Sequence, residues 1–371
     1  MRVTNNMMRN NSTLNMQKNK VAYDKYLQQY TTQKKIQRPS DDPTIAVRAL
    51  KYRTTISEID QYLKNIEDAT SWMDVTETVL KDIDKRLDTM VDVCTEAATG
   101  TVNAKDRENL VKQLRENASY IFEQDANQDY AGRYLFTGYR TDVPLLFEEN
   151  QTNVTYHIQE KLEINDINKY EYVYGQPVYD DAKTDQDYAQ EASKFQTTHR
   201  ILVSYDNCDD AGVVIRYKDK DGNEQTVTAV NKKIGDDTVF NEHLQPGDDE
   251  IYFVEETGEL VFGDKIYDKI RGGSDLQVEY EKTKFNKGQI RPEHYFDCTT
   301  TDNGTGKTIT YNTTDTQTIR YQINFSQTLV VNTQACNSIN TSIYRHVDEV
   351  ANICNDLAVS YTHLRAHETC A

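Results

Sequence analysis

The sequence feature that most constrains this fold is a run of one hundred residues without proline, from Thr44 to Val143. Proline breaks helix interiors, so its absence permits long helices. Apolar or small side chains recur from Ala49 to Ala97 in steps of three and four residues, which is the heptad repeat of a coiled coil. We predict that the seam of this coiled coil contains Ile56, Ile59, Leu63, Ile66, Met73, Leu80, Ile83, Leu87 and Met90.

The first long helix has a clear start signal. Ser40, Asp41 and Asp42 are N-cap candidates, and Pro43 suits the first turn of a helix. From Pro43 to Thr99 a helix would extend roughly 85 Å, at 1.5 Å per residue, and such a length predicts a rod.

A second helix is expected after a turn at residues 100–104. It should fold back antiparallel on the first and end near Ala131-Gly132, where glycine is a common terminator. Its predicted apolar face consists of Leu110, Leu114, Ala118, Ile121 and Ala126.

The character of the chain changes after Thr141. Short alternating segments separated by turn signals, among them Asp221-Gly222-Asn223, predict an antiparallel β region over residues 141–331. Helical periodicity returns over residues 332–359. We therefore expect an α+β protein in which residues 44–140 form an elongated antiparallel α-helical coiled-coil rod and the β domain is inserted. Residues 1–43 form a basic N-terminal segment.

The distribution of charge limits the partners. The first 53 residues hold 11 basic and three acidic side chains, whereas the chain as a whole carries −18, so the remainder carries −26. This balance argues against nucleic-acid binding, because phosphates require a basic face, and the N-terminal arm carries no known nucleic-acid-binding motif. We expect the arm to pack against acidic protein surfaces. No apolar run approaches the roughly 20 residues that span a bilayer, so no membrane partner is expected.

Three segments superficially suggest chemistry, and each is better explained otherwise. Asp219 to Glu224 resembles part of a calcium loop, but Thr228 stands where the closing ligand belongs, so a hairpin turn is favoured. His363 and His367 share helical spacing without a third ligand. Gly132 to Gly138 follows a helix rather than a strand and lacks the P-loop ending. We assign no catalytic, cofactor-binding or metal-binding residue, and predict that the protein is not an enzyme and has no cofactor.

Four segments carry a family resemblance. They are Met1 to Met8, Gln37-Arg38-Pro39-Ser40-Asp41-Asp42-Pro43, Gly132-Arg133-Tyr134-Leu135-Phe136-Thr137-Gly138-Tyr139, and Tyr321-Gln322-Ile323-Asn324 with Val331-Asn332-Thr333. Together they resemble the bacterial flagellin superfamily, and within it the hook-associated proteins of the hook–filament junction. Filament flagellin typically has Ser-Ala-x-Asp-Asp-Ala-Ala-Gly at the second segment. Here Pro39 and Pro43 flank the acidic pair, which favours the junction proteins.

The resemblance implies a structural role in the flagellum, outside the cell. The terminal helices would pair and pack with other copies in a ring, and their free ends would be disordered before assembly. The implied partners are hook-associated protein 1, flagellin and an export chaperone, with export through the flagellar type III apparatus. Arg38, Asp41 and Asp42 would make contacts within or between subunits, although helix capping by Ser40 or Asp41 explains the acidic pair equally well.

Some features depart from that family, and other interpretations stay open. The predicted return helix is under half the length needed to pair with Pro43–Thr99, and residues 360–371 do not continue its seam. We therefore expect a C-terminally truncated chain with a non-native tail. The alternatives are filament flagellin, a secreted coiled-coil adhesin whose β domain binds a ligand and, more distantly, a metal-dependent enzyme.

Overall fold

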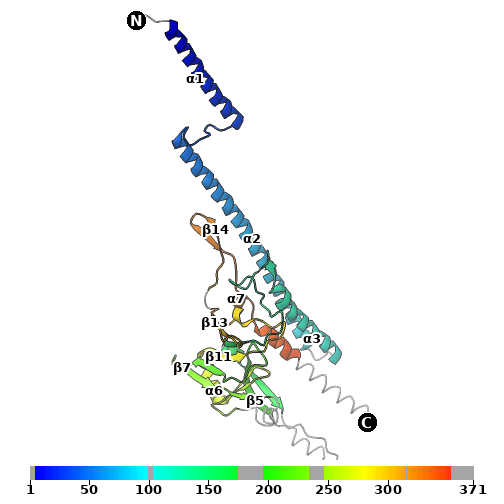
Figure 1. The fold of residues 1–371 in the computed structure, drawn as a ribbon. Helices are drawn as coiled ribbons and strands as arrows, with labels where there is room; N and C mark the ends of the chain where they lie inside the picture. Colours follow the sequence, from blue (N-terminus) through cyan, green and yellow to red (C-terminus); the bar gives the residue numbers. More distant parts are fainter. Residues whose placement is uncertain (1–4, 99–102, 174–194, 234–245, 314–315, 352–371) are drawn as a thin grey trace, which may run out of the picture. The chain divides into compact units, whose positions relative to one another are not determined.

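The computed structural model describes residues 5–98, 103–173, 195–233, 246–313 and 316–351. Helices come first, a β-rich region follows, and helical segments return near the end, so the fold class is α+β as the sequence predicts (Figure 1). The chain forms two compact units. The first comprises residues 1–69 and 321–329, and the second comprises residues 70–320 and 330–371.

The first unit contains helix α1 (Asn5–Thr32), the beginning of α2 (Pro43–Ala97) and the hairpin of β14 (Arg320–Asn324) and β15 (Gln327–Val330). The amide of Asn65 on α2 donates to the carbonyl of Gln322 on β14 at 2.7 Å, which ties the hairpin to the helix. Helix α1 buries no residue. The sequence predicts a disordered free end over this segment, and the structure instead forms a helix that leaves its apolar side chains exposed.

Helix α2 is continuous over 55 residues, which confirms the long proline-free helix. Two shorter elements follow it, helix α3 (Ala104–Ser119) and a π-helix, η1 (Tyr120–Asp125). The chain runs antiparallel to α2 here, because Trp72 meets Tyr130 edge-on while the more distal Arg86 pairs with Asp125. The predicted apolar face of this second helical segment is confirmed, since each of its members is buried: Leu110, Leu114, Ala118, Ile121 and Ala126.

Two sheets form the β-rich region. The larger has the strand order β13-β12-β3-β11-β6-β7, and the smaller has the order β4-β5-β10-β9-β8. The larger sheet contains β3 (Val154–Leu162), β6 (Val214–Lys218), β7 (Glu224–Thr228), β11 (Ser274–Lys282), β12 (Asp297–Asp302) and β13 (Thr308–Tyr311). The smaller contains β4 (Asn168–Val173), β5 (Phe195–Leu202), β8 (Val230–Lys232), β9 (Ile251–Val254) and β10 (Glu259–Phe262). Residues of both sheets share one buried core, so alternate strand positions face inward from each.

The β region differs from the sequence prediction in two ways. It is not wholly antiparallel, because β8 runs parallel to β9. It also contains helix α6 (Asp264–Arg271), which buries Ile266 and Ile270, and the short 3₁₀ turns η2 (Ile164–Asp166) and η3 (Pro292–His294).

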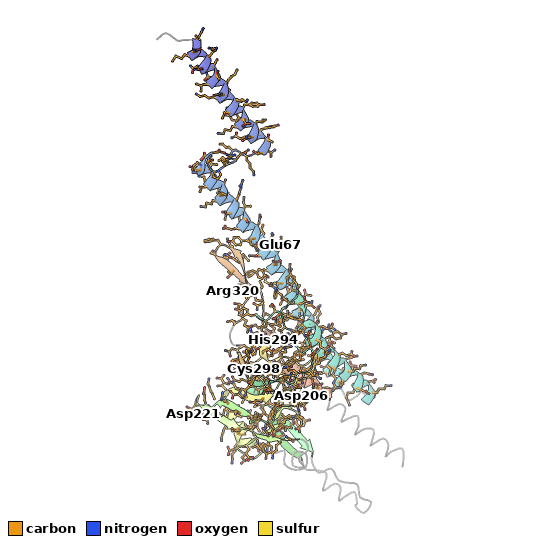
Figure 2. All side chains as sticks on the ribbon, viewed as in Figure 1. Glu67, Asp206, Asp221, His294, Cys298 and Arg320 are labelled. Carbon is orange, nitrogen blue, oxygen red and sulfur yellow. The ribbon has the colours of Figure 1, made fainter. Side chains whose placement is uncertain are left out.

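The calcium-like segment is the hairpin turn that the sequence favours. It joins β6 to β7, and Asp221 lies in it (Figure 2). The Asp219 carboxylate accepts hydrogen bonds from the backbone N–H groups of Asp221 and Asn223, each at 2.9 Å. The Asp219 carboxylate therefore stabilises the hairpin turn.

The C-terminal segment is helical in two pieces rather than one. Helix α7 (Ala335–Ser338) ends at Ile339, whose backbone is extended. Asn340 then accepts a hydrogen bond from the backbone N–H of Ser342 at 2.9 Å and begins a helix over residues 342–351. The continuous helix expected from residue 332 is therefore interrupted. Residues 352–371, with His363 and His367, lie outside the described part of the chain.

Two further observations concern classes of function. No helix among the described residues has both the length and the apolar character needed to cross a bilayer. Within the same ranges, no three histidine, cysteine, aspartate or glutamate side chains gather in an arrangement that could hold a metal ion.

Candidate assembly site

The turn that precedes α2 is organised by its two adjacent aspartates. The Asp41 carboxylate accepts hydrogen bonds from the backbone N–H groups of Gln37 and Arg38, at 3.2 and 3.1 Å. These bonds, that of Arg38 first and that of Gln37 second, hold the pKa of Asp41 below its usual value. Asp41 therefore closes the turn, and it does so in the ionised form.

The N-cap of α2 is Asp42. Its carboxylate accepts from the backbone N–H of Ile45 at 3.1 Å, and its carbonyl accepts the first helical hydrogen bond, from Ala46, at 2.9 Å. Pro43 occupies the first helical position, as the sequence predicts. The capping role expected for Ser40 or Asp41 thus belongs to the next residue, while Arg38, Pro39 and Ser40 are exposed in the turn.

Beyond this turn, the predicted seam begins on the exposed surface of α2. Ile56 and Leu63 expose 58% and 53% of their surface, and Ile59 and Ile66 expose 49% and 39%. These four side chains, which we call the exposed row, lie at helical spacing in the first unit (the nearby Glu67 is labelled in Figure 2). Four large apolar side chains aligned on one helix face are characteristic of a protein–protein contact.

The rest of the seam is buried only in part. Ile83 and Met90 are buried against the second helical segment, whereas Met73, Leu80 and Leu87 are half-buried. The most buried apolar side chains of α2 follow a second heptad pattern, shifted from the predicted one. They are Trp72, Val79, Ile83, Met90 and Val93. Sequence reasoning missed Trp72 and Val79, although their spacing of seven residues was visible.

Two of these half-buried side chains, Met73 and Leu80, line a shallow groove on α2. Its cavity measures about 550 Å³ and its apolar wall consists of Met73, Leu80 and Val331. Thr76, Glu77, Lys81 and Asp84 complete the lining. The second unit of the molecule therefore also leaves apolar surface of α2 accessible.

Gly132 is placed differently from the sequence prediction. It does not end a helix, because the π-helix already ends at Asp125. Strands β1 (Asp129–Tyr130) and β2 (Arg133–Tyr134) pair instead, and Ala131 and Gly132 form the two-residue turn between them. Both turn residues have positive φ, 52° and 76°, which is the geometry of a type I′ hairpin turn.

The segment after this hairpin packs against the start of the C-terminal region. Phe136 is buried, and its carbonyl accepts from the backbone N–H of Ala335 at 2.9 Å. The backbone N–H of Tyr139 donates to the side-chain oxygen of Gln317 at 2.9 Å. Gly138 has φ +66°, and a Cβ atom there would lie 2.2 Å from that same oxygen. The segment from Gly132 to Tyr139 thus connects the helical hairpin to Gln317 and Ala335.

The helix over residues 342–351 contacts the β region with one face. The hydroxyls of Thr341, just before the helix, and Ser204 share a hydrogen bond of 2.8 Å. Arg345, one turn later, donates to the carbonyls of Val203 and Thr257. Glu349, a further turn along, pairs with Arg200 of β5.

A neighbouring face of the same helix contacts the helical hairpin. The rings of Tyr344 and Phe122 meet edge-on with their centroids 6.1 Å apart. Asp348 pairs with Arg115 of α3 at 3.6 Å. Val347 and Ala351 are buried along the same helix. We call residues 341–351 the bridge segment, because it contacts both the β region and α3.

Comparison with known proteins agrees with these features at the N-terminal end. Residues 3–141 match the bacterial flagellin N-terminal helical region. The matched part, which is less than half of the chain, is similar to that region. It contains the turn before α2, the seam and the Gly132 to Tyr139 segment.

Two relatives to which this chain is similar are named flagellar hook-associated protein 3. The protein from Salmonella typhimurium strain LT2 is 27% identical over 142 residues, which cover 38% of this chain and 45% of the relative. That from Escherichia coli strain K12 is 26% identical over 149 residues, which cover 40% of this chain and 47% of the relative. The match therefore spans less than half the length of each relative.

Among solved structures, FlgL of Xanthomonas campestris is 10% identical, with 82% of this chain and 91% of that chain covered and a TM-score of 0.25. The flagellar junction protein FlgL from Legionella pneumophila is 12% identical, with 87% and 99% covered and a TM-score of 0.25.

Proposed function

We propose that the protein is a structural component of the bacterial flagellum that joins the hook to the filament. The similarity of its N-terminal part to flagellar hook-associated protein 3 supports this function. The observation that carries the proposal is the exposed row of α2, Ile56, Ile59, Leu63 and Ile66, because a structural subunit needs apolar surface for its neighbours.

The energetics of the exposed row favour assembly. Burying a large aliphatic side chain is worth about 1.5–3 kcal/mol, so four half-exposed side chains supply several kcal/mol when a neighbouring helix covers them. In the single chain this surface stays in water. Association of copies in a ring, through coiled-coil packing of terminal helices, would remove it.

The proposal extends to partners and location. Copies of the chain would contact hook-associated protein 1 on one side and flagellin on the other, after export as an unfolded chain through the flagellar type III apparatus with the help of a chaperone. Residues 1–43 would act in export and assembly, 44–140 as the helical rod, 141–331 as the inserted β domain and 332–359 as the start of the return helix. The role is structural rather than enzymatic.

Immunogold electron microscopy of native flagella tests the location. With an antibody raised against this chain, label confined to one narrow zone where hook meets filament supports the proposal. Label along the whole filament identifies a filament flagellin instead. Label on the cell body, with none on the flagellum, identifies a surface adhesin.

A binding experiment tests the exposed row. We expect Ile59→Asp with Leu63→Asp to reduce association of the purified chain with itself, hook-associated protein 1 and flagellin by at least tenfold in sedimentation. The matched control is Ser57→Asp with Gln61→Asp, which adds the same two negative charges at exposed positions away from the row and should leave association near the unsubstituted value. Equal loss in both variants would contradict a role for the apolar row.

A further inference from the structure

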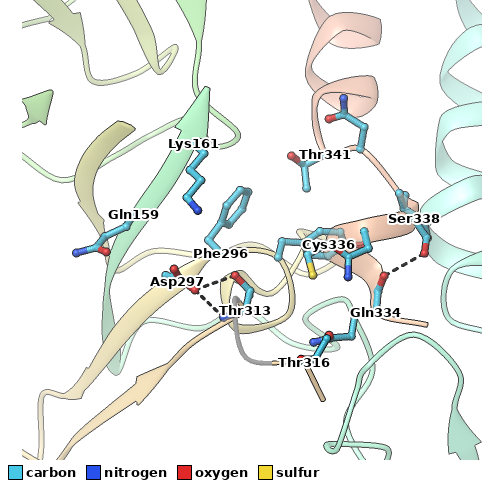
Figure 3. A pocket seen from close by; sticks show the side chains of 14 residues that line it. Gln159, Lys161, Phe296, Asp297, Thr313, Thr316, Gln334, Cys336, Ser338 and Thr341 are labelled. Atoms are coloured by element: carbon cyan, nitrogen blue, oxygen red, sulfur yellow. Dashed lines mark hydrogen bonds between the residues drawn. The ribbon is translucent and has the colours of Figure 1, made fainter. Parts of the chain in front are cut away.

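A polar cavity lies beside the outer face of β3, and its lining shares no residue with the exposed row of α2. Its volume is about 670 Å³, within the ~300–1,000 Å³ typical of small-molecule sites. Residues from four separate parts of the chain line it: β3, the segment from Tyr295 to Asp297, the two residues Thr313 and Thr316, and residues 334–341 (Figure 3).

Amides and hydroxyls dominate the lining. Side chains of these two kinds come from Gln159, Thr313, Thr316, Gln334, Asn337, Ser338, Asn340 and Thr341. An amide offers both a donor and an acceptor, and a hydroxyl offers either. The cavity thus presents many paired donor and acceptor groups, which is the complement of a ligand that carries several hydroxyls.

Internal hydrogen bonds fix part of this lining before any ligand enters. The Asp297 carboxylate accepts from the backbone N–H and the hydroxyl of Thr313, at 2.6 and 2.8 Å, and Figure 3 shows both bonds. The carbonyl of Gln334 accepts from the Ser338 hydroxyl at 3.0 Å, while its side-chain oxygen accepts from the backbone N–H of Gln317 at 3.3 Å. A wall held in this way loses little conformational freedom when it binds.

Other lining groups have hydrogen-bonding capacity to spare. The Tyr295 hydroxyl is buried and has no hydrogen-bond partner among the described residues. Almost none of its area is accessible, so it lies behind the surface that a ligand would touch. Lys161 and Asn337 are exposed lining residues, and their side chains make no hydrogen bond within the described ranges that would compete with a ligand.

An aromatic ring completes the arrangement. Phe296 lines the cavity, is half-exposed, and projects into the space beside Lys161 (Figure 3). Its position is fixed from behind by Tyr205, whose ring lies 6.0 Å away at 72°. A rigid ring face amid polar side chains matches the two surfaces of a pyranose, which has a C–H face for the ring and hydroxyls around its edge.

We propose that this cavity binds a saccharide of one or two sugar units. The lining is too polar for a lipid, and Lys161 is the single basic side chain in it, which is too little positive charge for a nucleotide polyphosphate. The site goes beyond the assembly role proposed above and does not depend on it, because no lining residue belongs to the exposed row.

The test is a glycan array of neutral and acidic sugars probed with the purified full chain, followed by isothermal titration with the best sugar. We expect saturable binding, and an affinity reduced at least tenfold by Lys161→Ala with Asn337→Ala, two exposed positions whose substitution should not unfold the protein. Tyr295→Phe, which removes a hydroxyl with almost no accessible area, is a control and should leave binding unchanged.

A matched pair of variants tests the aromatic contact. Phe296→Ala should abolish sugar binding, whereas Phe325→Ala, at the exposed tip of the β14–β15 hairpin, should leave it unchanged. Circular dichroism of both variants establishes that they are folded. Absence of binding to every sugar on the array overturns the proposal, as does binding that survives the Lys161 and Asn337 substitutions together.

Discussion

The Arg86 guanidinium on α2 lies 2.7 Å, Nε to Oδ2, from the carboxylate of Asp125, the last residue of the π-helix. The same guanidinium stacks 4.7 Å from the ring centre of Tyr120, the first residue of that π-helix. Both the first and the last residue of the π-helix therefore contact the same side chain of α2. This contact fixes the register of the helical hairpin at a point where both charged groups are largely buried.

Asp125→Asn should lower the free energy of unfolding by about 1–3 kcal/mol, because a hydrogen bond between two charged groups is lost and Arg86 stays largely buried. Urea unfolding followed by the fluorescence of Trp72, the single tryptophan of the chain, measures this change. The control is Glu77→Gln, which breaks an exposed pair with Lys81 on the same helix and should leave the midpoint unchanged. Equal losses of stability in Asp125→Asn and Glu77→Gln would contradict the view that burial makes the Arg86–Asp125 pair important.

Acid should destabilise the protein through His294. Burial, aided by Arg140 and Arg291, lowers the pKa of His294 to about 3, whereas an unfolded histidine titrates near 6.5 (His294 is labelled in Figure 2). Below pH 6.5 the unfolded chain takes up a proton at this histidine, and the folded chain does not. The free energy of unfolding therefore decreases as the pH is lowered, and at pH 5 it is about 2 kcal/mol below its value at neutral pH. Melting curves between pH 7 and 5 should show a smaller loss for His294→Leu. Parallel pH profiles would contradict this.

Glu160 should give the opposite pH dependence. Burial raises its pKa, although Ser204 and Tyr280 donate hydrogen bonds to its carboxylate. The folded chain therefore keeps the proton to higher pH than the unfolded chain, and this contribution to stability is lost as pH rises above about 4.5. Glu160→Gln stays neutral, so its melting temperature relative to the unsubstituted protein should rise between pH 4 and 7. A difference that is constant with pH would refute the prediction.

Two glycines with similar backbone geometry should respond differently to alanine. Gly132→Ala meets open space and costs only the strain of a positive φ, about 1–2 kcal/mol. Gly138→Ala adds a collision with the Gln317 side chain, and so breaks its bond to the Tyr139 backbone. We expect a clearly larger loss of stability at Gly138 in chemical unfolding. Gly132→Asn serves as the control, because asparagine tolerates this conformation.

Local patterns predicted much of the helical part of this fold. The proline-free run and the Asp-Asp-Pro start signal located α2, and the apolar spacing from Leu110 to Ala126 identified a buried face correctly. Which face of α2 is buried was harder to predict. Two apolar rows lie one residue apart along the helix: Trp72 with Val79, and Met73 with Leu80. The side chains of the facing segment decide between them, and heptad spacing alone does not contain that information.

Pairings between distant residues could not be predicted. The parallel pair of β8 and β9 and the order of strands in each sheet depend on contacts that no local pattern encodes. Gly132 illustrates another limit, because glycine ends helices and forms tight turns by the same freedom at positive φ. The polar cavity has walls from four separated stretches, so neither Tyr295 nor Lys161 carries a recognisable signal in sequence.

The bridge segment has a consequence for the order of folding. Its contacts join residues far apart in the chain, with 149 positions between Arg200 and Glu349 and 142 between Val203 and Arg345. Closing such large loops is entropically costly, so these contacts form late, after the strands and the helical hairpin are in place. During synthesis from the N-terminus, the β region and α3 stay unlinked by this segment until its residues emerge. Weakening it should therefore accelerate unfolding more than it slows folding.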